Sequence, residues 1–162
     1  MTELMNSSRF DKLLKAENLE KTLNNGWQSY FSVQGGNEAV KALKYEEAEK
    51  CFRIVVAETE DTVQYVSAIG GLILMASSVD EASGLQAKGL AKIDAWFSAI
   101  ESPSAEEKNN KTVLVFEMKD RYADFYYPID PDKSKEMSSV AVEEARREAG
   151  VDASEREHAG KI

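Results

Sequence analysis

The side chains most often used as nucleophiles and bases are scarce in this chain. Its only histidine, His158, lies in a polar stretch near the C-terminus, away from any cysteine, serine or carboxylate that a core site would need. Its only cysteine, Cys51, stands beside Phe52 on the apolar face of a predicted helix, where we expect a buried thiol and not a nucleophile. One histidine and one cysteine are too few for a zinc site, so we expect no metal.

Carboxylates and tyrosines remain as groups that could move protons. Glu117, Asp120 and Asp124 occur beside the aromatic cluster Tyr122–Tyr127, and a closed pocket built from them would suit a small lyase or hydrolase. Aromatic side chains at this spacing are more often part of a core than of a ligand site. Because no histidine is at hand to complete such a site, we expect a protein that is not an enzyme and that has no cofactor.

The elements that would position these residues are helices. Apolar residues recur at steps of three and four along most of the chain, and Asn37, Ser78 and Ser104 are suitable N-caps. The predicted helical segments are residues 9–23, 27–33, 38–58, 62–79, 80–101, 105–126 and 133–149. Asn24-Asn25-Gly26 is expected to break the chain, and a strand is the alternative for Thr112–Phe116. Short links between six or seven helices predict an all-α fold of antiparallel hairpins.

The stretch Thr62–Val79 contains no charged residue in a chain that is 30% charged, so it must be buried. A membrane span would need about 20 apolar residues and flanking cations, which this stretch lacks. A strand pair turning at Gly70-Gly71 is possible. The three- and four-residue spacing favours a core helix, whose start Asp61 can cap.

Composition limits the class of protein. The chain has 162 residues, of which 43% are hydrophobic, and it carries a net charge of −9. We expect a single helical domain over residues 1–150 and a loose polar tail over residues 151–162. The acidic balance argues against nucleic acid and anionic membranes as partners. A single cysteine and an N-terminal stretch without a basic and apolar leader suggest a cytoplasmic protein.

One resemblance is to tetratricopeptide repeats (TPR). Ala48 and Ala82 are 34 residues apart, which is the period of that repeat. The segment KYEEAEKCF, residues 44–52, resembles the start of a TPR second helix, with Ala48 and Phe52 in matching places. Gly70 lies where the repeat has a small residue, but no third copy follows. This likeness implies a peptide-binding chaperone or assembly module.

A second resemblance, to the 14-3-3 family, keeps its order over about two thirds of the chain. The resembling segments are YEEAEKCFRIVVAE (45–58), QYVSAIGG (64–71), LAKIDAWFSAIE (90–101), KTVLVFEMKDRYADFYY (111–127) and SKEMSSVAVEEARREA (134–149). They are similar to the second to sixth helices of the family. The hairpin formed by the third and fourth helices is shorter here, by a similar length on each arm.

This likeness implies a dimeric adaptor with a groove for phosphoserine or phosphothreonine peptides. The groove positions that hold the phosphate in the family fall on Val66, Ile73, Glu117, Asp124 and Phe125. A phosphate with a charge near −2 needs Arg or Lys forks, and it would meet carboxylates and aliphatic side chains here. The resemblance therefore predicts that the fold is kept while phosphate recognition is lost.

The expected function follows from the two resemblances. We expect a non-enzymatic adaptor or scaffold for a protein or peptide partner, 14-3-3-like but without phosphopeptide recognition. The likeness implies a homodimer formed through about residues 9–34 and 62–100. The alternatives are a TPR-like peptide-binding module and a helical domain whose partner surface cannot be read from one sequence.

Overall fold

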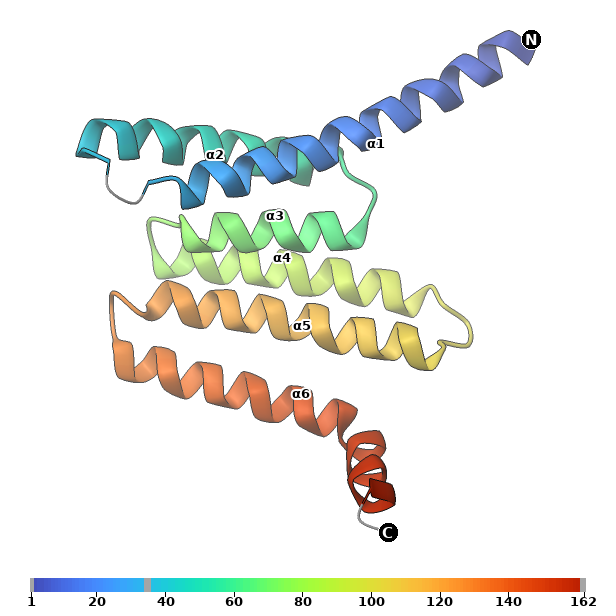
Figure 1. The fold of residues 1–162 in the computed structure, drawn as a ribbon, viewed down its shortest axis with the longest axis vertical. Helices are drawn as coiled ribbons and strands as arrows, with labels where there is room; N and C mark the ends of the chain where they lie inside the picture. The colour runs from blue at the N-terminus through green and yellow to red at the C-terminus, as the bar shows by residue number, and fades with distance from the viewer. Residues whose placement is uncertain (1, 34–35, 161–162) are drawn as a thin grey trace. The chain divides into compact units, whose positions relative to one another are not determined.

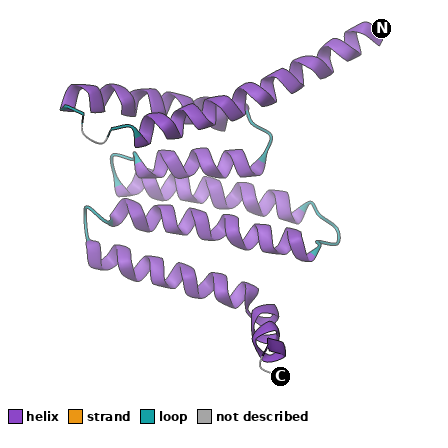
Figure 2. Ribbon diagram, viewed as in Figure 1, coloured by secondary structure: helices purple, strands orange, loops and turns teal. Residues whose placement is uncertain are grey.

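The computed structural model describes residues 2–33 and 36–160, and it describes side chains for residues 16–33 and 36–149. This part of the chain consists of helices and connecting loops, without a strand (Figures 1 and 2). The helices are α1 (Thr2–Phe31), α2 (Glu38–Glu58), α3 (Thr62–Leu74), α4 (Val79–Ser98), α5 (Ala105–Tyr126) and α6 (Pro131–Gly160). The all-α prediction is confirmed, and Thr112–Phe116 is helical, within α5.

The chain forms two compact units. The N-terminal unit extends to Leu72 and contains the hairpin α1–α2 and most of α3, whereas the C-terminal unit starts at Ile73 and contains α4, α5 and α6. The boundary between the units lies inside α3, which is a mostly apolar helix and not a polar segment such as a linker. The single domain predicted for residues 1–150 therefore stays a prediction.

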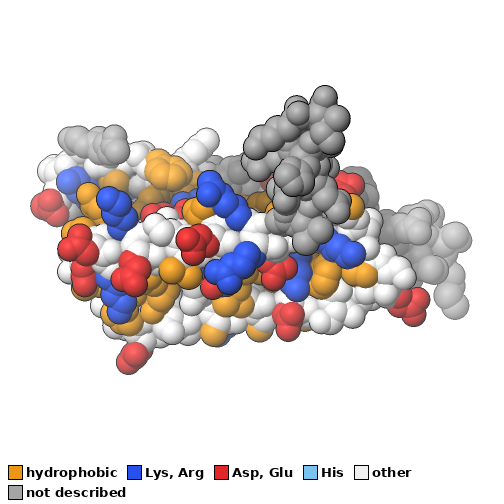
Figure 3. Space-filling model, turned by 90° about the horizontal axis from the view of Figure 1, so that it is seen from below, with side chains coloured by type: hydrophobic (Ala, Val, Ile, Leu, Met, Phe, Trp, Pro, Cys, Tyr) orange, Lys and Arg blue, Asp and Glu red, His pale blue; other side chains and the backbone are white. Residues whose placement is uncertain are grey.

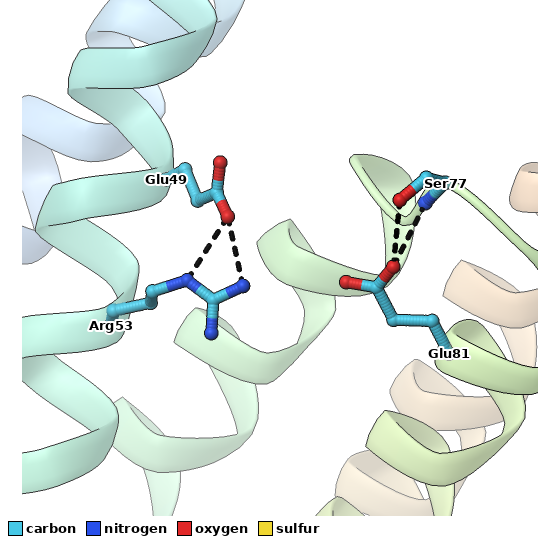
Figure 4. A network of polar contacts seen from close by, with 4 residues as sticks. All are labelled: Glu49, Arg53, Ser77 and Glu81. Atoms are coloured by element: carbon cyan, nitrogen blue, oxygen red, sulfur yellow. Dashed lines mark hydrogen bonds and ion pairs between the residues drawn. The ribbon is translucent and has the colours of Figure 1, made fainter.

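The helix starts agree with the capping signals in the sequence. The side chains of Asn37 and Ser78 accept hydrogen bonds from the third residue of α2 and α4, and Ser104 and Glu107 form a reciprocal capping box on α5. Glu81 adds two hydrogen bonds at the start of α4, because its carboxylate accepts from both the N–H and the hydroxyl of Ser77 (Figure 4). These bonds satisfy N–H groups that have no partner inside the helix.

The predicted break at Asn24-Asn25-Gly26 is wrong, because α1 runs without interruption to Phe31. Gly26 is used for packing instead. A Cβ atom on Gly26 would lie 2.9 Å from Cε1 of Phe52 and 3.0 Å from Cβ of Cys51. The glycine therefore lets α1 approach α2 closely. This contact outweighs the cost of a glycine inside a helix, which is about 1 kcal/mol relative to alanine.

The uncharged stretch is a core helix, but a shorter one than predicted. Helix α3 ends at Leu74, residues 75–78 form the turn, and Val79 is the first residue of α4. Because Ser78 caps α4, the preceding residues must leave the helix. The buried hydrophobic residues of α3 are Val66, Ala68, Ile69, Leu72 and Ile73. No helix in the described residues is long and apolar enough to cross a membrane.

The end of the last helix also differs from the prediction. Helix α6 begins at Pro131 and its backbone stays helical to Gly160, whereas Gly150 was expected to end it. Residues on both sides of Gly150 are mostly Ala, Glu and Arg, which are strong helix formers and offset a single glycine. The side chains of the predicted tail, His158 among them, lie outside the described residues.

Candidate functional site

Two of the predicted groove positions are in the core. Val66 and Ile73 lie on α3, and neither has any exposed surface. A side chain without exposed surface cannot contact a partner in this structure. Val66 and Ile73 therefore pack in the core in this structure. Their binding role stays a prediction.

The other three predicted positions lie on α5. Glu117 and Phe125 are half-buried and Asp124 is exposed. Arg121 lies between the two carboxylates along the helix, and its Nη1 is 4.0 Å from Oδ2 of Asp124. Burial raises the pKa of Glu117, an effect that Arg121 reduces, and burial together with Asp120 raises the pKa of Asp124. An incoming phosphate would meet these carboxylates, which does not favour its binding.

Of the residues considered for acid–base chemistry, Tyr122 lines a cavity between α5 and α6, and Glu117, Asp120 and Asp124 are not among the residues that line it. Tyr122 packs its ring against Phe125 and Tyr126, with centroids 6.4 and 5.3 Å apart. Asp120 accepts a hydrogen bond from the hydroxyl of Ser138, with an oxygen–oxygen distance of 3.2 Å. Among the described residues, no group of three or more His, Cys, Asp or Glu side chains is placed to hold a metal ion.

Cys51 has the environment of a packing residue. It is half-buried and faces Gly26 of α1. Burial, and then the nearby carboxylate of Glu47, raise the pKa of its thiol. Since the thiolate is the nucleophilic form, this environment opposes nucleophilic chemistry at neutral pH.

A site that the sequence did not reveal lies on the hairpin of α5 and α6. Polar contacts join the helices near the connecting loop. The Ser134 hydroxyl donates a hydrogen bond of 2.6 Å to the carbonyl of Ala123, and Ser138 donates to Asp120. Farther from the loop, Lys119 forms an ion pair with Glu144. This pair lowers the pKa of Glu144 because Lys119 both donates a hydrogen bond and carries a positive charge.

The Ser134 bond closes the end of α5. The N–H of Tyr127 bonds to Asp124, so the carbonyl of Ala123 lacks its usual helical partner and accepts from Ser134. Both residues are buried.

We expect Ser134→Ala to lower the free energy of unfolding by about 1 kcal/mol, because a buried acceptor loses its donor. Urea titration followed by circular dichroism measures this loss. Ser139→Ala makes the same change at an exposed position of α6 and should have little effect. Equal effects of the two variants would contradict the assigned role of Ser134.

Beyond the Lys119–Glu144 pair, α5 and α6 enclose a groove with a cavity volume of about 610 Å³. It is lined by Lys111, Thr112, Val115, Phe116 and Lys119 of α5 and by Ala141, Glu144, Ala145, Arg147 and Glu148 of α6. We call it the α5–α6 groove. A second cavity of about 400 Å³ lies on the other side of the pair and reaches Gln86 of α4. Neither cavity is lined by Glu117, Asp120 or Asp124.

The α5–α6 groove is lined by both apolar and charged side chains. The apolar residues of the lining are Val115 and Phe116 on α5 and Ala141 and Ala145 on α6. The lining also contains three cations and two carboxylates, although the whole chain carries a net charge of −9. Figure 3, seen from the α6 side, shows acidic and basic side chains interspersed with hydrophobic ones.

The groove volume lies in the range of about 300–1,000 Å³ that is usual for binding sites. The only sequence signal for it was the alignment of apolar stripes on the two helices, which a packed interface would also produce. A comparison of the chain with protein-family models, curated proteins and solved structures finds no match.

Proposed function

We propose that the protein is a non-enzymatic adaptor or scaffold, 14-3-3-like in its fold, that binds a protein partner without recognising phosphate. The observation that carries this proposal is the set of side chains at the positions where the resemblance places phosphate ligands. Val66 and Ile73 have no exposed surface, and Glu117 and Asp124 are carboxylates. Phosphate recognition needs Arg or Lys forks at such positions.

The proposal predicts no preference for phosphorylated peptides. We expect a fluorescently labelled phosphoserine peptide and its unphosphorylated twin to bind with equal affinity in anisotropy titrations. A preference of about tenfold or more for the phosphorylated peptide, about 1.4 kcal/mol, would contradict the proposal. The variant Glu117→Lys/Asp124→Arg serves as the control. It should gain affinity for the phosphorylated twin if these positions lie at the peptide site.

The proposal includes a homodimer formed through about residues 9–34 and 62–100. The described part of these ranges has exposed large apolar side chains, namely Phe31 on α1, Val63 on α3 and Val79 on α4. Exposed apolar side chains favour association when they meet a second apolar surface. Static light scattering at micromolar concentration should give twice the mass of the chain.

A TPR-like peptide-binding module is the second candidate. One observation favours it: Ala48, Phe52 and Ala82, which match the repeat in type and spacing, are all completely buried. In a repeat array such residues pack one helix against the next. A monomer in light scattering would favour this candidate over the dimeric adaptor.

A further inference from the structure

We draw no further inference here: the strongest candidate, the surface patch at which the exposed Phe31 ring stacks on Trp27 of α1 and Tyr45 of α2 packs beside Tyr30, is an apolar face for which nothing in the structure shows what covers it.

Discussion

Replacing Phe52 by alanine is expected to lower the free energy of unfolding of the N-terminal unit by about 3–5 kcal/mol. The Phe52 ring has no exposed surface, and its centroid lies 5.0 Å from that of Trp27. Gly26 of α1 and Gly71 of α3 both approach the same ring. Because the ring lies against both helices, its loss leaves a cavity that neither helix can close alone.

Urea unfolding followed by tryptophan fluorescence measures this loss, since Trp27 lies beside the ring. The control is Ile54→Ala, which truncates an apolar side chain of the same helix that is 41% exposed. We expect that variant to cost about 1 kcal/mol or less. Similar losses for the two variants would show that Phe52 is not the centre of the unit.

Replacing Gly71 by valine is expected to cost about 3 kcal/mol, the upper end of the usual range for overpacking. A Cβ atom at this position would lie 2.5 Å from Cζ and 2.7 Å from Cδ2 of Phe52. These distances are far below van der Waals contact, and the buried ring has no free space into which to move. The gain in helix propensity, less than 1 kcal/mol, does not offset the clash.

Gly84→Val is the matched control, because a Cβ atom on Gly84 of α4 would meet nothing within 4 Å. That variant should leave the urea midpoint close to the wild-type value. The double variant Phe52→Ala/Gly71→Val should be less unstable than the sum of the two single variants, because the valine can occupy space that the ring leaves. Additive losses would show that the two positions do not compete for the same space.

The candidate site could be predicted from the sequence only in part. Apolar stripes on α5 and α6, with Val115 on one and Ala141 and Ala145 on the other, were visible as helical periodicity. That pattern does not distinguish a packed seam from an open one. The difference is decided by how the two helices pack, with Ser138 of α6 hydrogen-bonded to Asp120 of α5 and a cavity farther along the hairpin.

The sequence by itself determined the helical class of the fold, most helix starts and the burial of α3. These features depend on signals within a few residues of each other: Asn37 caps α2, Ser104 and Glu107 cap α5, and the uncharged stretch had to be buried. Only the tertiary structure decided that Gly26 continues a helix and packs against Phe52, and that α5 and α6 enclose a groove. Both outcomes depend on contacts between residues distant in sequence, which local propensity does not contain.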